Sequence, residues 1–181
     1  MKKRILILLL ILLSFSTTAC VKSNKNNPNK KSITITDKDN NYKTTFYYDK
    51  KEKYTKPVIN YSEQNNEVTF TNKDLNIEFQ MYYNVFPNDS YKAAKEARKD
   101  QKYYQDYKFG KYKGYTYGNL DDVIYLNIYL DKKKEYGEII LFTTIKKADS
   151  SQKETIKELF DNEKIQSMLK TITFEIEKNK K

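Results

Sequence analysis

Hydrophobic and polar residues alternate with period two along several stretches of the chain. In Leu75–Tyr83 every second residue is apolar and most residues between are polar. Successive side chains of a strand point to opposite faces, so this pattern predicts a strand with one buried face. Residues 123–130 repeat the alternation. Ile139–Ile145 is largely apolar on both faces, which predicts a central strand covered on both sides.

Shorter stretches of the same kind predict the remaining strands. They are Ile33–Thr36, Thr44–Tyr48, Val58–Tyr61, Glu67–Thr71, Tyr107–Tyr117 with a turn inside it, and Ile172–Ile176. Three glycines, Gly110, Gly114 and Gly118, recur four residues apart among lysines and tyrosines, and this setting favours hairpin turns over a phosphate-binding loop.

Two segments have helical character. Ser90–Tyr104 is rich in alanine, lysine, glutamate and glutamine and places a weak stripe on one face, formed by Tyr91, Ala94, Ala97, Gln101 and Tyr104. Later, Ser151 and Glu154 fit a capping box. Helical spacing follows from Ile156 to Leu169, with a break expected at Asp161-Asn162. The order of elements predicts one α+β domain, an antiparallel sheet carrying two main helical segments.

The N-terminus has a different pattern. Lys2, Lys3 and Arg4 precede an uninterrupted aliphatic run, Ile5–Leu13, which is shorter than the roughly 20 residues that cross a bilayer. This layout is typical of a signal peptide, here residues 1–19. We therefore do not expect a mature transmembrane helix.

The end of this leader, Thr17-Thr18-Ala19-Cys20, resembles the lipobox of bacterial lipoproteins. Ala19 and Cys20 match the pattern, whereas Thr17 replaces the preferred leucine. The resemblance implies cleavage after Ala19 and a diacylglycerol on Cys20, which would hold the protein at the extracytoplasmic face of the cell membrane. The alternatives are ordinary secretion, with Cys20 left as a free thiol, and a retained signal anchor.

Composition divides the rest of the chain. Residues 20–32 contain the lipidated cysteine and a lysine- and asparagine-rich stretch with too little apolar surface to fold, so we expect a flexible tether. Residues 33–177 are enough for one domain with its own core. Residues 178–181 form a basic tail.

The domain resembles the PsbP-like fold of photosystem extrinsic proteins and small bacterial lipoproteins. The likeness rests on the order of elements and on the stretches "FGKYKGYTYG" and "TITFEIE". It implies an α/β/α-like sandwich with a binding or assembly role. It transfers no functional residue to this sequence.

The formal net charge is +10. A basic domain could bind nucleic acid, but much of the excess lies in the leader and the tether, and an exported chain meets little nucleic acid. We expect no nucleic-acid partner. The expected partners are the bilayer, through Cys20, and an envelope protein or an anionic cell-wall polymer.

The sequence has no histidine and one cysteine. This excludes Ser/His and Cys/His catalysis and thiolate or histidine metal sites, and we expect neither a metal nor a cofactor. The local carboxylate pairs are Asp121-Asp122, Asp37 with Asp39, and Asp161 with Glu163. Each lies beside turn residues, where capping or solvation is usual, so no catalytic residue is predicted. The stretch Asp37–Asn41 begins like a calcium loop but has Tyr42 where glycine is required, which favours a turn.

Lys102–Tyr117 interleaves seven aromatic residues with lysines. An exposed strand of this kind could stack sugar rings or hold an anionic polymer. The candidate ligand-binding residues, which share one parity, are Phe109, Lys111, Lys113, Tyr115 and Tyr117. The alternative is that the rings belong to the core and to a solvated strand face.

These patterns favour a membrane-anchored surface lipoprotein that acts as a non-enzymatic binding or assembly module at the cell envelope. Two alternatives stay open. One is a small carboxylate-dependent hydrolase of cell-wall glycans. The other is an immunity or inhibitor lipoprotein that masks a secreted toxin or lytic enzyme.

Overall fold

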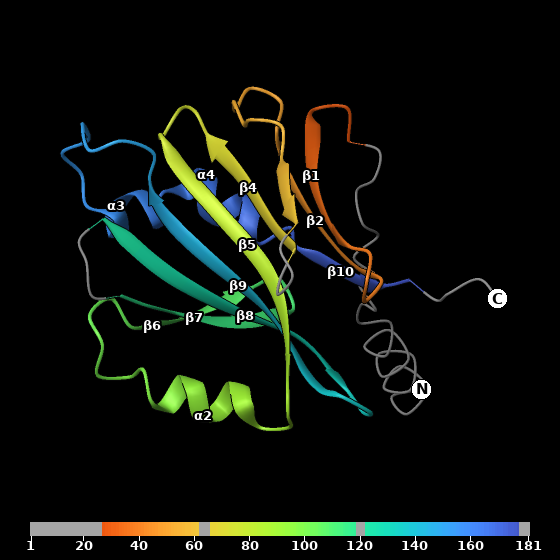
Figure 1. Cartoon of the computed structure of the whole chain (residues 1–181). Helices are drawn as coiled ribbons and strands as arrows, with labels where there is room; N and C mark the ends of the chain where they lie inside the picture. Colours follow the sequence, from red (N-terminus) through yellow and green to blue (C-terminus); the bar gives the residue numbers. More distant parts are fainter. Residues whose placement is uncertain (1–26, 62–65, 119–121, 178–181) are drawn as a thin grey trace, which may run out of the picture.

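The computed structural model describes residues 27–61, 66–118 and 122–177, which form two antiparallel sheets and three helices (Figure 1). The strands are β1 (Lys30–Asp37), β2 (Tyr42–Asp49), β3 (Val58–Tyr61), β4 (Asn66–Asn72), β5 (Ile77–Phe86), β6 (Gln105–Phe109), β7 (Tyr112–Tyr117), β8 (Val123–Lys133), β9 (Gly137–Lys147) and β10 (Thr173–Ile176). The helices are α2 (Ser90–Glu96), α3 (Ile156–Phe160) and α4 (Glu163–Leu169).

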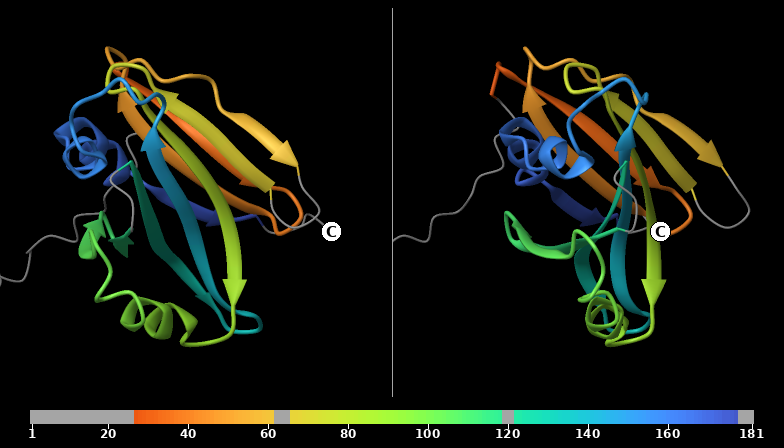
Figure 2. Two further views of the ribbon diagram at one scale, coloured as in Figure 1. Left: turned by 60° about the vertical axis from the view of Figure 1, so that its left-hand side comes forward. Right: turned by 90° about the vertical axis from the view of Figure 1, so that its left-hand side faces the viewer.

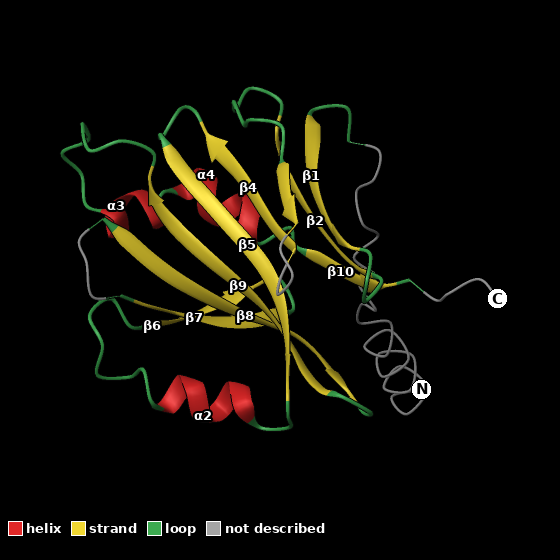
Figure 3. Ribbon diagram, viewed as in Figure 1, coloured by secondary structure: helices red, strands yellow, loops and turns green. Residues whose placement is uncertain are grey.

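The larger sheet has seven strands in the order β3-β4-β5-β9-β8-β7-β6, and the smaller has three in the order β1-β2-β10 (Figure 3). The predicted α+β class and antiparallel pairing are confirmed. The strands predicted for a single sheet are divided between two. β9 lies at the centre of the larger sheet, as its apolar residues on both faces indicated.

The main core lies between the inner face of the larger sheet and a second layer made of the smaller sheet, α3 and α4 (Figure 2). The alternating apolar residues of β5 and β8 all point into it. The Tyr83 hydroxyl donates a hydrogen bond to Thr44 Oγ1 at 2.5 Å and so joins β5 of one sheet to β2 of the other. The helices contribute the buried side chains of Ile156, Phe160 and Leu169.

Helix α2 lies on the outer face of the larger sheet, at the end near β6 and β7 (Figure 1). Its buried residue, Tyr91, packs with Tyr115 and Ile140 in a second, smaller apolar cluster. The outer face is therefore covered by a helix at one end.

The helix predicted over Ser90–Tyr104 ends at Glu96, and this part of the prediction was wrong. Tyr91 is buried, but Ala94 and Ala97 of the expected stripe are exposed, and Tyr103 takes a left-handed φ of 63°. A short helix is stable in water mainly when an apolar face is buried. Beyond Glu96 no such face remains, and the chain continues in turns.

The capping box is also displaced. Thr155 Oγ1 accepts from the backbone N–H of Glu158, whose carboxylate accepts from the backbone N–H of Thr155. Ser151 bonds instead to Asp149. The predicted break at Asp161-Asn162 is confirmed, because Asn162 caps α4 through its side chain.

The folded part begins slightly earlier than expected. β1 starts at Lys30, inside the predicted tether, and Asn29 O accepts a hydrogen bond from Lys50 N at 2.9 Å. The predicted signal peptide, Cys20 and the basic tail at 178–181 lie outside the described residues. In the part that the structure describes, no helix has the length and hydrophobicity needed to cross a membrane.

Candidate functional site

The five candidate residues from the sequence do not share one face. Gly110 and Lys111 form a two-residue turn between β6 and β7, with Gly110 at φ 58°, so Phe109 stands opposite Tyr112. Phe109 belongs to the main core on the inner face, whereas Lys113, Tyr115 and Tyr117 point to the outer face. Parity along a strand predicts a common face only where no turn intervenes.

Tyr115 is a core residue of the outer cluster. It is fully buried, packs edge-on against Tyr91 at 5.4 Å between ring centroids, and its hydroxyl accepts from Asn127 Nδ2 at 2.9 Å. Burial raises the pKa of the Tyr115 hydroxyl. Tyr115 therefore cannot present a ring to a ligand from solvent.

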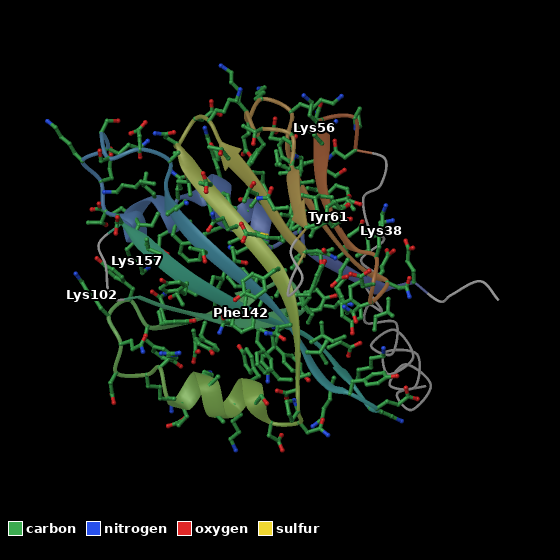
Figure 4. The ribbon with its side chains drawn as sticks, in the orientation of Figure 1. Lys38, Lys56, Tyr61, Lys102, Phe142 and Lys157 are labelled. Carbon is green, nitrogen blue, oxygen red and sulfur yellow. The ribbon has the colours of Figure 1, made fainter. Side chains whose placement is uncertain are left out.

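The uncovered part of the outer face carries pairs of stacked rings. Tyr82 and Phe142 are direct cross-strand partners, with ring centroids 5.3 Å apart and ring planes 8° apart. Phe142 is labelled in Figure 4. Tyr117 and Tyr125 form a similar pair at 5.2 Å and 21°, and the Arg98 guanidinium lies 4.9 Å from the Tyr117 ring centroid. Each of these rings uses one of its two faces on its partner, and Arg98 also lies against the Tyr117 ring, so less ring surface is left for a sugar to stack on.

A concave site lies at the turn end of the β6–β7 hairpin. Pairing of β7 with β8 stops at Lys113 and Tyr129. There β8 has a β-bulge at Leu130, since Tyr129 pairs with Ile140 and Asp131 with Ile139. A bulge bends its strand and redirects side chains. The chain beyond Tyr129 thus leaves β7 and opens a cleft of about 510 Å³.

Apolar side chains from three strands form the floor of this lysine cleft. They are Tyr112 of β7, Leu130 of β8 and Phe174 of β10. Tyr112 and Leu130 are almost fully buried, and the Tyr112 hydroxyl accepts a hydrogen bond from Phe174 N at 3.2 Å. This contact brings the smaller sheet to the cleft, so both sheets contribute to it.

Three exposed lysines surround the cleft. Lys108 and Lys113 are direct cross-strand partners, and Lys111 lies in the turn between their strands. Two of them rest on aromatic rings. Lys113 Nζ is 5.0 Å from the Tyr129 ring centroid and 5.3 Å from that of Tyr91, and Lys111 Nζ is 5.0 Å from that of Tyr112. These contacts hold the ammonium groups at the rim of the cleft.

The lysines of the cleft have little compensating charge. Asp131 is the single acidic residue of the lining, and its Oδ1 accepts from the backbone N–H of Lys132 at 2.8 Å. Across residues 27–61, 66–118 and 122–177, none of the three lysines forms an ion pair. The site is therefore cationic at its rim and apolar at its floor.

Glu52 is the one described carboxylate with a raised pKa. Burial raises the pKa of Glu52, and Glu52 Oε2 is buried with no hydrogen-bond partner in the described part of the chain. Glu52 does not line the lysine cleft. Asp74 and Glu154 share another cleft of about 430 Å³, where Asp74 accepts from Lys53 N at 3.1 Å. Glu52 is not part of that cleft either.

The predicted carboxylate pairs have structural roles where they are described. Asp37 accepts from the backbone N–H groups of Asp39 and Asn40 and shapes the β1–β2 turn, as expected. Asp161 accepts from the Tyr107 hydroxyl at 2.6 Å and pairs with Lys157, which joins α3 to β6. Among the residues described, no group of three metal-ligating side chains comes together.

Sequence reasoning identified part of the lysine cleft and missed the rest. Lys111 and Lys113 were candidates and lie in it, whereas Phe109, Tyr115 and Tyr117 do not. Lys108 and Tyr112 stood in the same lysine- and tyrosine-rich stretch, which was the available signal. Tyr129 lies at the cleft because it pairs with Lys113, Leu130 because of the bulge, and Phe174 because β10 packs against Tyr112. Comparison with protein-family models, curated proteins and solved structures finds no match to this chain.

Proposed function

We propose that this protein is a lipoprotein of the bacterial cell surface, anchored through Cys20 and acting as a binding or assembly module at the envelope. The anchor is supported by the leader and by the sequence Thr17-Thr18-Ala19-Cys20. One acyl chain binds a bilayer only marginally and two bind it firmly, so a diacylated Cys20 would be a stable attachment.

The observation that carries the binding role is the lysine cleft. It combines lysines that form no ion pair with any described residue and a ring-lined apolar floor, which is the composition expected of a binding site for an amphipathic anion. The two partners proposed from the sequence, an anionic wall polymer and an envelope protein, could both supply such a group. We also propose a PsbP-like relationship from the order of the elements along the chain, and the single α+β domain is compatible with it.

Labelling with palmitate tests the anchor. The chain should incorporate label and fractionate with membranes, and Cys20→Ser should abolish the label. A Cys20→Ser variant labelled as strongly as the unaltered chain would disprove the anchor. Such a result would leave the binding role to be judged separately.

Crosslinking on intact cells tests the binding role. The anchored protein should be captured with a wall polymer or an envelope protein, and the yield should drop when Lys108, Lys111 and Lys113 are all replaced by glutamine. Capture of a secreted toxin or lytic enzyme would replace this proposal with the inhibitor function. Unchanged capture by the triple variant would remove the cleft from the proposal.

One observation favours the hydrolase as a second candidate. Glycoside hydrolysis needs a carboxylic acid of raised pKa beside an ionised carboxylate. Burial raises the pKa of Glu52, and Asp49 and Asp74 add smaller contributions in the same direction, although Glu52 lines neither of the two clefts described above. A Glu52→Gln variant should then lose any release of soluble fragments from purified cell walls. Absence of such release by the unaltered chain would eliminate this candidate.

A further inference from the structure

The lysine cleft has the features of a site for one particular class of anion. We propose that it binds phosphodiester groups, with Lys108, Lys111 and Lys113 holding the phosphate and the apolar floor contacting the neighbouring part of the ligand. This inference rests on the proposed binding role and specifies its ligand. It does not depend on the anchor at Cys20.

Lys108 and Lys113 lie opposite each other in the β6–β7 hairpin. Their Cα atoms are direct cross-strand partners in the β6–β7 ladder. Like charges at opposed positions of an antiparallel pair destabilise it. The nearest carboxylate in the same ladder is that of Asp106, which pairs with Tyr115. It forms an ion pair with Lys95 at 2.9 Å and therefore does not neutralise Lys108 or Lys113. A bound anion would attract both Lys108 and Lys113 and so offset the repulsion between them.

The three lysines also converge in space. Like most lysines of the described ranges, Lys108, Lys111 and Lys113 form no ion pair there. They differ from isolated surface lysines because they line one concave surface from a strand, a turn and a second strand. Lys113 is also positioned, since its ammonium group lies against both Tyr129 and Tyr91. Part of the entropy cost of ordering it for a ligand is thus already met.

The kind of anion is indicated by the lysines together with the floor. Lysine ammonium groups are common phosphate ligands, although they also bind carboxylates. The choice of phosphate over carboxylate is therefore tested directly by comparing the two kinds of oligomer. The floor made by Tyr112, Leu130 and Phe174 favours a ligand in which an apolar or ring surface adjoins the phosphate. A glycerol- or sugar-linked phosphodiester has this chemistry, in a free polymer or in a lipid headgroup.

Binding to the full-length chain, purified in detergent, tests the proposal. The probes are short oligomers of glycerol phosphate, and calorimetry should give an affinity that falls as salt is added. Replacing Lys108, Lys111 and Lys113 by glutamine should weaken binding by about tenfold or more. A matched variant with Lys50, Lys51 and Lys134 replaced by glutamine has the same charge change at exposed positions away from the cleft and should bind within about twofold of the unaltered chain.

A single substitution separates binding from folding. Lys108→Gln should raise the thermal stability of the ligand-free protein by removing the repulsion with Lys113, and should reduce the extra stability that the oligomer confers. A Lys108→Gln variant that is less stable than the unaltered chain without ligand would contradict the repulsion between Lys108 and Lys113. Equal loss of affinity in the triple variant and in its matched control would show a general charge effect and overturn the site.

Two further binding measurements test the class of the ligand and its source. A uronic-acid oligomer of the same length should bind more weakly, and equal or tighter binding would overturn the choice of phosphate. Glycerophosphoglycerol, which is the headgroup of phosphatidylglycerol without its acyl chains, is then compared with the longer oligomers. Equal affinity supports a lipid headgroup as ligand, and affinity that rises with length supports a free polymer. Palmitate labelling is unaffected by any of these outcomes.

Discussion

Glu138 Oε2 accepts a hydrogen bond from the backbone N–H of Tyr91 at 2.6 Å, although 47 residues separate the two. Tyr91 lies in the first turn of α2, where N–H groups lack partners inside the helix. The N-cap residue, Asp89, has a left-handed φ of 69° and makes no side-chain capping bond. The Glu138 carboxylate of β9 thus caps the N-terminal turn of α2 in place of the Asp89 side chain, and it fixes α2 against the outer face of the larger sheet.

The first prediction is that Glu138→Ala lowers the free energy of unfolding by about 1–3 kcal/mol, because it leaves a buried N–H without an acceptor. Glu138→Gln should cost less, since the amide oxygen can still accept. Urea unfolding measures the loss, and hydrogen exchange at the Tyr91 amide should become faster. Glu135→Ala, at an exposed position of the same hairpin, is the control. Equal losses in Glu135→Ala and Glu138→Ala would disprove the capping role.

The second prediction distinguishes the observed capping box from the expected one. Thr155→Ala should destabilise the protein by about 0.5–2 kcal/mol, because the first turn of α3 loses its side-chain acceptor. Ser151→Ala should cost less, since the hydrogen bonds of Ser151 to other described residues go to Asp149 of the same loop and not to a helix. Thermal unfolding of the two variants gives the order. The reverse order would restore the capping box that the sequence suggested.

The third prediction concerns alkaline pH. Burial raises the pKa of Tyr83, Tyr91 and Tyr107 above the usual value of 10.0. An unfolded tyrosine ionises near that value, so the stability these groups contribute is complete below about pH 10 and is lost as the pH rises towards their folded values. Urea unfolding between neutral pH and about pH 11 should show this loss.

Tyr83→Phe provides the check. At neutral pH it should cost about 1 kcal/mol, because the hydrogen bond to Thr44 between the two sheets is lost. Above about pH 10 its stability should fall less steeply than that of the unaltered chain, since one buried ionisable group is gone. Parallel curves for the two proteins over the alkaline range would contradict the burial effect.

The fourth prediction compares two glycines. Gly137 has φ 107°, and a Cβ there would lie 1.7 Å from Phe86 O, so Gly137→Ala should prevent folding or force β5 and β9 apart. Gly110 has φ 58° in the β6–β7 turn, and its Cβ would meet Lys170 O at 2.9 Å. Gly110→Ala should therefore cost roughly 1–2 kcal/mol and still fold. Yield of soluble protein and thermal unfolding give the comparison, and a stable Gly137→Ala would refute the close approach.

Local periodicity was sufficient to predict most strands. In β5 the alternation predicted which side chains face the core, and in β9 the apolar residues on both faces predicted a central position, because each residue of a strand has its face set by the neighbours before and after it. The absence of histidine excluded several kinds of catalysis without any structure. The leader and Cys20 led to the proposed anchor in the same way.

The division into two sheets, the end of α2 and the lysine cleft depended on long-range contacts. Periodicity does not carry through a turn, so the Gly110–Lys111 turn placed Phe109 on the face opposite to Tyr115. It also does not report an extra residue such as Leu130, whose bulge separates β8 from β7. Lys108 and Lys113 are neighbours because the register of the β6–β7 hairpin places them opposite each other. Phe174 lies near them because β10 pairs with β2. Sites assembled from several strands follow from register and packing, which are properties of the whole fold.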